Sequence, residues 1–334
     1  MLFSGRGDGA PVLFLHGNLS SATWWEETML ALPADFRGIA PDQRGFGEAD
    51  PAAKIDAMRG MGDLVDDAIA LLDQLGIAKA HVVGNSMGGP IVFRMLADCP
   101  QRLRTATLAG PGSPFGFGGT RDVDGTPCWP DFAGSGGGLF NRKLIERIAE
   151  GDRSADSPLS PRAALRALVW KPPFVPKREE DLLSALLSVH VGSQDTPGDF
   201  SQSPNWPGFA PGVWGATNAL SPKYASRVDR LCAAAPKVPV LWVRGDDDVA
   251  ISNTAQSDPG YLGSRGMIKH WPGAEVYPPQ PMVSQIRSVL ESYAAAGGLC
   301  REVVIGDCGH VPFIEKPEQF NAVFHPHLTG WLVG

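Results

Sequence analysis

The sequence predicts an α/β protein with a mostly parallel, doubly wound sheet that is interrupted by a large, mainly helical and irregular insertion. Short apolar runs alternate with segments of helical periodicity over residues 11–112, and the same alternation resumes over residues 238–324. Between them the chain is rich in glycine, proline, serine and aromatic residues. We therefore expect a core of residues 1–112 and 232–334, with an insertion over residues 113–231.

The first half of the core supplies most of the expected strands. Residues 61–75 carry apolar side chains at helical spacing and end at Gly76, which predicts a helix. Three strands end in glycine-rich turns, and parallel pairing brings such turns to one edge of the sheet. Strands are expected at residues 11–15, 38–40, 80–83 and 103–109, with further helices at residues 20–32 and 91–97.

The insertion precedes the second half of the core. It has too many apolar residues for a disordered linker. We expect it to fold over the edge of the sheet; an unrelated domain packed elsewhere is the alternative. Helical patterns cover residues 139–150, 161–170 and 178–189 of the insertion. In the core that follows, strands are expected at residues 238–245 and 301–306. Helices are expected at residues 283–296 and in a closing segment that contains Phe320 and Phe324.

Composition narrows the classes of partner. With 29 Lys and Arg against 36 Asp and Glu, the 334-residue chain carries a net charge of −7 and has no basic run, which argues against nucleic acid or an anionic membrane as its partner. Its five cysteines form no Cys-x-x-Cys pair, so reduced thiols in a cytoplasmic protein are expected. No signal peptide or transmembrane segment is apparent, and the composition specifies no oligomeric state.

The turn Gly84-Asn85-Ser86-Met87-Gly88 lies between an expected strand and an expected helix. A serine in a strained turn needs neighbours without side chains, and its hydroxyl would stand above the sheet at a helix N-terminus. A glycine-rich turn without chemistry is the alternative. Two further features also follow strands: the acidic cluster at residues 246–248, and His310. Acyl transfer needs such a nucleophile, an orienting carboxylate and a base, and parallel strands bring these three positions to one edge of the sheet.

These motifs resemble those of the α/β-hydrolase superfamily, and the resemblance covers nearly the whole chain, with the insertion where that superfamily carries its lid. It implies that Ser86 is the nucleophile and His310 the general base. The acid is expected three residues beyond the strand-ending glycine, at Asp248, although spacing leaves Asp247 open. The long interval to His310 implies an excursion at residues 252–282.

The resemblance also implies an oxyanion hole formed by the backbone N–H groups of Met87 and Asn18. His16, in the His-Gly turn after the first strand, is expected to be structural. Pro41-Asp42-Gln43-Arg44-Gly45 looks like a structural turn in which Arg44 pairs with a carboxylate. The neighbouring loops and the aromatic insertion suggest a pocket lined by Leu19, Trp24, Trp25, Trp129, Trp214 and Val311.

The leading functional hypothesis is a serine hydrolase that cleaves a small-molecule ester or lactone, with a bulky apolar group, through an acyl-enzyme. No metal or phosphate-binding motif is present, so no cofactor is expected. The serine turn also resembles that of meta-cleavage-product hydrolases, which break carbon–carbon bonds, but Asn18-Leu19-Ser20 and Val311 depart from that group. A binding protein without turnover is the third possibility, and Ser86 argues against hydrolases of this fold that use an aspartate nucleophile.

Overall fold

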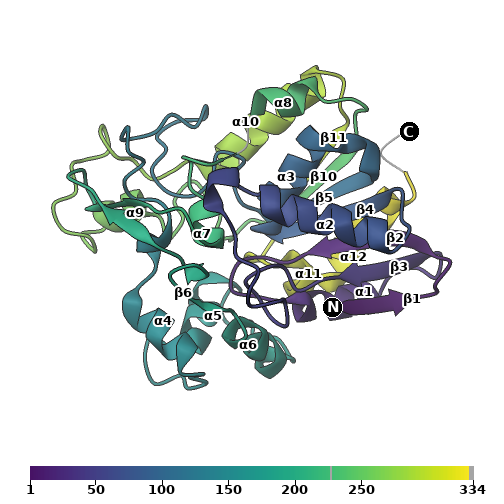
Figure 1. Cartoon of the computed structure of the whole chain (residues 1–334), viewed down its shortest axis with the longest axis horizontal. Helices are drawn as coiled ribbons and strands as arrows, with labels where there is room; N and C mark the ends of the chain where they lie inside the picture. The colour runs from purple at the N-terminus through teal and green to yellow at the C-terminus, as the bar shows by residue number, and fades with distance from the viewer. Residues whose placement is uncertain (226–227, 331–334) are drawn as a thin grey trace.

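The computed structural model describes residues 1–225 and 228–330 and shows a layered core beside a smaller lobe (Figure 1). The core contains a seven-stranded sheet in the order β1-β3-β2-β4-β5-β10-β11. All neighbours pair in parallel except β1 and β3. The strands are β1 (Leu2–Gly5), β2 (Ala10–Leu15), β3 (Phe36–Ala40), β4 (Ala80–Ser86), β5 (Leu103–Pro111), β10 (Val240–Gly245) and β11 (Cys300–Ile305).

This topology confirms the predicted fold class, and it adds one strand that the sequence pattern does not predict. Strand β1 is four residues long and lies at the sheet edge, where Phe3 stands opposite Ile39 and is 60% exposed. Its burial alternates along the strand, so it offers no continuous apolar run of the kind that identifies the central strands.

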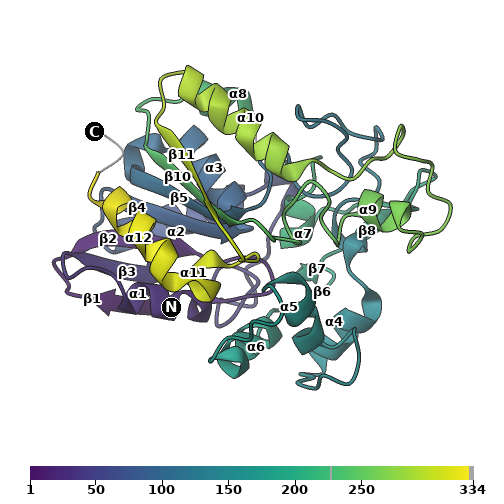
Figure 2. The same cartoon turned by 180° about the vertical axis from the view of Figure 1, so that it is seen from behind.

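Helices cover both faces of the sheet. Helices α2 (Gly62–Gln74) and α3 (Gly88–Asp98) lie on the face seen in Figure 1, and α11 (Pro312–Glu315) and α12 (Pro317–Leu328) lie on the opposite face (Figure 2). The remaining core helices are α1 (Glu26–Leu30), α8 (Val228–Ala233) and α10 (Met282–Ala295), and short 3-10 turns occupy Ala22–Trp25, Ala57–Arg59 and Pro100–Arg102.

The core between these layers is apolar and closely packed. The central strands are almost entirely buried because helices cover both of their faces, as parallel sheets require. Phe14 of β2 contacts the rings of Trp25 and Phe324, which tie the loop after β2 and α12 to the sheet. No helix among the described residues has the length and apolar character needed to cross a membrane.

The inserted segment forms the lobe at the strand ends. Its helices confirm the three predicted helical stretches. The lobe also contains two small sheets. The lobe contains α4 (Arg142–Ala149), α5 (Pro161–Leu168), α6 (Glu179–Leu187), α7 (Ala216–Ala219), a 3-10 turn at Gly137–Leu139, the parallel pair β6 (Val191–Gly192) and β7 (Thr196–Pro197), and the antiparallel pair β8 (Phe200–Gln202) and β9 (Phe209–Pro211).

A second stretch of chain, residues 252–281 with α9 (Pro259–Ser264), packs into the same lobe (Figure 1). The Tyr277 hydroxyl donates to the Ala133 carbonyl at 3.2 Å, and the Tyr277 ring lies edge-on to Trp206 at 4.7 Å. Gln280 donates to the Gly116 carbonyl at 3.0 Å and accepts from the Gly118 N–H at 2.7 Å. The excursion expected from the long interval before His310 is therefore part of the lobe.

Candidate active site

Ser86 is the last residue of β4 and has a φ of +52°, in the left-handed region that residues other than glycine rarely adopt. The flanking glycines leave room for this turn. A Cβ on Gly84 would collide with the Gly88 carbonyl, and a Cβ on Gly88 would collide with the Leu15 carbonyl of β2. The predicted strand, sharp turn and helix are thus all present, with a strained serine at the turn.

Asp248 and His310 come together from the loops after β10 and β11. His310 Nδ1 lies 2.8 Å from Asp248 Oδ2, and both side chains are buried. The other oxygen of Asp248 accepts from the N–H groups of Ala250 and Ile251, at 2.8 Å each, which fixes the carboxylate. With Nδ1–H donated to the carboxylate, Nε2 of His310 is the acceptor nitrogen.

The neighbouring acids have other partners. Asp247 is exposed and pairs with Lys171, whereas Asp246, also exposed, accepts from the Cys308 N–H at 3.4 Å. Only Asp248 among the three is buried beside the imidazole. The geometry therefore favours the expected offset over the alternative at Asp247.

The pKa of His310 is raised above its ordinary value. Burial acts to lower it, but the charge of Asp248, the hydrogen bond to Asp248 and the charge of Glu315 together outweigh burial. Such an imidazole readily accepts a proton. This is the property that a general base beside a serine requires.

The loop after β2 passes directly beside the serine. A Cβ on Gly17 would lie 2.9 Å from Cβ of Ser86. In this loop Leu19 has a φ of +53°, and its N–H donates to Oδ1 of Asn18 at 3.0 Å. Met87 precedes the first turn of α3, where backbone N–H groups have no helical acceptor. These positions suit an oxyanion hole, and the roles of Asn18 and Met87 stay predictions.

His16 is a structural residue in this loop, as the sequence indicates. The Gln43 N–H donates to its Nε2 at 3.0 Å, so Nδ1 carries the proton and donates to the Gly17 carbonyl at 2.8 Å. Gln43 also donates to the His16 carbonyl at 2.8 Å. Burial lowers the pKa of His16 to about 4, which keeps the ring neutral at physiological pH.

Other histidines lie away from this arrangement. His81 Nδ1 is 2.9 Å from Thr105 Oγ1, and His327 donates from Nε2 to the Ala106 carbonyl at 3.0 Å. Burial lowers the pKa of each to about 4. His270 is exposed. His81 is therefore the core histidine that its strand position predicts.

The residues predicted to line a substrate pocket lie in different surroundings. Trp24 donates from its indole to the Leu182 carbonyl of α6 at 3.3 Å, so it contacts the lobe. Trp25 is fully buried and stacks on Phe313 with ring centroids 4.0 Å apart, within the hydrophobic core. Val311 is fully buried, and Leu19, Trp129 and Trp214 are half-buried. Contact of these side chains with substrate stays a prediction.

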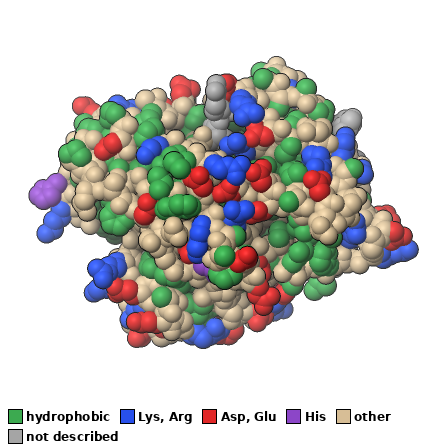
Figure 3. All heavy atoms as spheres, viewed as in Figure 1, with side chains coloured by type: hydrophobic (Ala, Val, Ile, Leu, Met, Phe, Trp, Pro, Cys, Tyr) green, Lys and Arg blue, Asp and Glu red, His purple; other side chains and the backbone are tan. Residues whose placement is uncertain are grey.

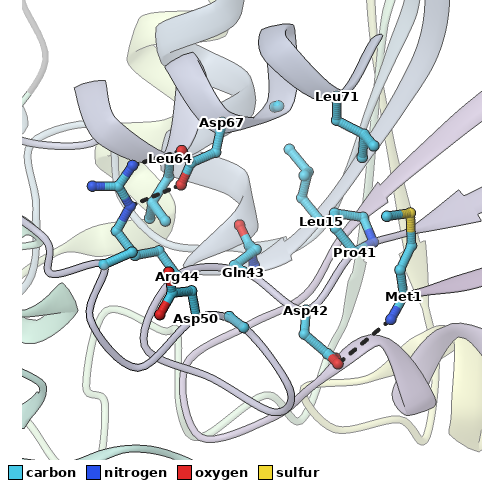
Figure 4. Close-up of a pocket in the computed structure, with 13 residues that line it drawn as sticks. Met1, Leu15, Pro41, Asp42, Gln43, Arg44, Asp50, Leu64, Asp67 and Leu71 are labelled. Atoms are coloured by element: carbon cyan, nitrogen blue, oxygen red, sulfur yellow. Dashed lines mark hydrogen bonds and ion pairs between the residues drawn. The ribbon is translucent and has the colours of Figure 1, made fainter. Parts of the chain in front are cut away.

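A separate cavity of about 310 Å³ lies between the loop after β3 and α2 (Figure 4). Arg44 at its rim pairs with both oxygens of Asp67, at 2.9 and 2.6 Å, which confirms the predicted pairing with a carboxylate. Gln43 lines this cavity and links it to the His16 loop. Neither Ser86 nor His310 lines it.

Sequence reasoning missed one buried acid near the site. Glu315, five residues after His310, is 7% exposed and accepts hydrogen bonds from the Gly309 and Lys171 N–H groups. The available signal is an acidic residue directly after the apolar residues 311–314. Within the described part of the chain, no group of three or more His, Cys, Asp or Glu could hold a metal ion.

The comparisons with known proteins agree with this fold. A family model described as the alpha/beta hydrolase fold matches residues 10–142. The 2-hydroxymuconate semialdehyde hydrolase of Pseudomonas sp. (strain CF600) is 37% identical over 107 residues, which are 31% of this chain and 37% of that protein. The dihydrolipoyllysine-residue acetyltransferase component of the acetoin cleaving system of Cupriavidus necator is 33% identical over 329 residues, 98% of this chain and 66% of that protein.

The chain covers 37%, 38% and 39% of the length of three curated relatives, which is less than two thirds of each. Among solved structures, a putative aryl esterase from Burkholderia cenocepacia superimposes with a TM-score of 0.58 at 18% identity, covering 100% of this chain and 94% of the other. At that identity the likeness shows the fold alone. Fold, family model and solved structures together show that the chain has the α/β-hydrolase fold.

Proposed function

We propose that the protein is a cofactor-free serine hydrolase that cleaves a carboxylic ester or lactone through an acyl-enzyme. The observation that carries this proposal is the buried pair of His310 and Asp248, with Nδ1 and Oδ2 2.8 Å apart. The pair follows strands of the same parallel sheet whose β4 ends at the strained Ser86. A base with an oriented partner and a serine at a helix N-terminus are the parts that acyl transfer requires.

In the proposed reaction, Oγ of Ser86 attacks the substrate carbonyl carbon while Nε2 of His310 takes the hydroxyl proton. Asp248 stabilises the resulting imidazolium, and the N–H groups of Asn18 and Met87 donate to the oxyanion. Collapse of the tetrahedral intermediate breaks the carbon–oxygen bond, and His310 returns its proton to the leaving alcohol. Water, activated by His310, then hydrolyses the acyl-enzyme.

The substrate proposed is a small molecule with a bulky, apolar acyl or alcohol part. Aromatic side chains from the core and the lobe meet in the segment that contacts His310: the rings of Trp24 and Trp170 lie 6.3 Å apart, and the neighbouring Val169 carbonyl accepts from the His310 N–H. Apolar and aromatic walls are typical of pockets for such ligands. We also place the protein in the cytoplasm, because its five cysteines are free thiols.

Carbon–carbon bond hydrolysis is the second candidate. It is favoured by the turn Gly84-Asn85-Ser86-Met87-Gly88-Gly89 and by relatives that are named as hydrolases of 2-hydroxymuconate semialdehyde and of 2-hydroxy-6-oxo-6-phenylhexa-2,4-dienoate. The loops facing the serine, with Asn18-Leu19-Ser20 and Val311, differ from that group and favour an ester or lactone.

The decisive experiment measures turnover of a substrate panel by the wild type and by Ser86→Ala and His310→Ala. The panel contains aryl esters of graded chain length, small and macrocyclic lactones, and a vinylogous diketone. We expect ester or lactone cleavage, and a loss of roughly 10⁴-fold or more in kcat in each variant with the fold intact. Ser201→Ala, at an exposed serine of β8, is the matched control and should behave as the wild type.

Three outcomes would change the assignment. Wild-type turnover by Ser86→Ala would remove the serine mechanism. Turnover of the diketone alone would establish the second candidate. A folded protein whose Ser86 is not labelled by a fluorophosphonate probe, and that turns over nothing in the panel, would be a binding protein of the same fold.

A further inference from the structure

The turn after His310 contains a carboxylate that the proposed mechanism does not use. Glu315, the last residue of α11, is buried, and the Gly309 N–H donates to both of its oxygens at 3.0 Å. The Lys171 N–H donates to Oε2 at 3.0 Å. Backbone N–H groups only donate, so they match an ionised carboxylate, which only accepts. Burial raises the pKa of Glu315 above its ordinary value, and these N–H groups, which act against burial, favour its ionised form in the turn that holds His310.

The lobe contacts this turn from the other side. The His310 N–H donates to the Val169 carbonyl at 2.8 Å, two residues before the Lys171 N–H that binds Glu315. Residues 169–171 of the inserted segment are thus tied to the backbone of His310 and to Glu315. At Gly309, a Cβ would lie 2.8 Å from Glu315 Oε1 and from the Lys171 nitrogen, so only glycine fits where the segments meet.

The charges around His310 come from several elements. Asp248 faces Nδ1 from the loop after β10, and Glu315 acts on the imidazole from α11. On the solvent side, the Lys171 ammonium from the lobe pairs with Asp247 and with Asp307, and Lys316 pairs with Asp307 at 3.0 Å. The Lys171 and Lys316 charges therefore have their own anions. The two buried carboxylates, Asp248 and Glu315, both act to raise the pKa of His310 against burial.

We propose that Glu315 is a positioning residue for the reaction: together with residues 169–171 it fixes the loop of His310, and its charge stabilises the imidazolium formed when Ser86 is deprotonated. This inference rests on the proposed role of His310 as the base. It gives the inserted segment a part in the chemistry, because the carbonyl of Val169 and the N–H of Lys171 belong to the lobe and hold the catalytic turn.

The test compares the pH dependence of kcat/KM in Glu315→Gln, Glu315→Asp and the control Glu318→Gln, an exposed glutamate in the first turn of α12. The base must be neutral to act, so kcat/KM falls as pH drops below the pKa of His310. Loss of the Glu315 charge lowers that pKa. We expect the acid limb of Glu315→Gln to move to lower pH by roughly one unit, a modest effect for a neighbouring charge.

At the pH plateau, kcat/KM of Glu315→Gln should fall roughly tenfold, the factor that corresponds to one pKa unit of lost stabilisation of the imidazolium. Glu315→Asp keeps the charge and should keep the wild-type acid limb even if its plateau is lower. Glu318→Gln should match the wild type in both. Titration of His310 by NMR of ¹⁵N-histidine-labelled protein gives the same comparison without turnover.

An unmoved acid limb and an unmoved His310 titration in Glu315→Gln would overturn the inference, as would an equal shift in Glu315→Asp, which would indicate a purely structural effect. If Glu315→Gln fails to fold, a displaced acid limb in Glu315→Asp is the overturning result. The proposed function has a separate failure: turnover retained by Ser86→Ala or His310→Ala. The two failures are therefore distinguishable in one series of variants.

Discussion

The loops after β2 and after β11 each place a buried histidine at the same edge of the sheet, and they treat it in opposite ways. His16 is 1% exposed and His310 is 5% exposed. Burial lowers the pKa of His16 to about 4, whereas carboxylates reverse the effect of burial at His310 and raise its pKa. Two backbone groups bind the ring of His16, whereas the carboxylate of Asp248 binds the ring of His310.

The comparison shows that the partner of a buried histidine, rather than its depth, decides what the ring can do. Backbone groups bind both nitrogens of His16, so its tautomer is fixed and neither nitrogen is available. Asp248 binds one nitrogen of His310 and leaves the other to accept a proton. Three predictions test this contrast.

The largest effect is expected for Asp248→Asn. An amide that replaces the carboxylate no longer stabilises the imidazolium and can impose the wrong tautomer on His310, so kcat should fall roughly 10⁴-fold. Asp247→Asn, at the exposed neighbour, is the matched control and should change kcat little. Steady-state kinetics on the preferred ester checks both. A severe loss in Asp247→Asn with a mild one in Asp248→Asn would reverse the assignment of the acid.

A smaller effect is expected for His16→Ala. This variant leaves the Gln43 N–H without a partner and removes one of two hydrogen bonds to the Gly17 carbonyl, which also accepts from Ser20 Oγ at 3.0 Å. The free energy of unfolding should therefore fall by about 2 kcal/mol. Because the loop carrying Asn18 loosens, kcat should fall by at most roughly 10²-fold. The acid limb of kcat/KM should not move, because His310 sets it. Urea unfolding and a pH profile test this, with His270→Ala at an exposed position as control; a shifted limb would mean that His16 takes part in proton transfer.

The smallest effect concerns acid stability. The unfolded chain binds a proton at His16 near pH 6.5, while the folded chain does so only near pH 4, so stability is lost as pH falls between these values. His16 alone should cost about 2 kcal/mol between pH 7 and pH 5. The difference in unfolding free energy between the two pH values should therefore be smaller in His16→Ala than in His270→Ala. Equal differences would contradict the buried, neutral state of His16.

The sequence predicts most of the core because its signals are local. Continuous apolar runs identify the central strands, and the glycines at 84 and 88 are required by the close crossing of strand and helix around Ser86. Strand β1 is missed because an edge strand needs only half of its side chains buried. Asp248 is predicted as the acid from its position three residues after the glycine that ends its strand, and the structure adds its contact with His310.

What the sequence does not predict depends on contacts between distant segments. The importance of Glu315 becomes visible only when Lys171, 144 residues away, is seen to donate to it. The burial of Trp25 against Phe313 likewise depends on the pairing of the loop after β2 with α11. Periodicity and spacing carry no information about such pairs.

The division of the lobe between two stretches of chain has a consequence for protein engineering. Strand β10 lies between these two stretches in sequence, and the contacts of Gln280 with Gly116 and of Tyr277 with Ala133 join the stretches in the lobe. A chimera that exchanged only the long insertion with that of another protein would leave the side chains of residues 252–281 without their partners. Recombination at this lobe therefore has to exchange two segments at once, with four junctions instead of two.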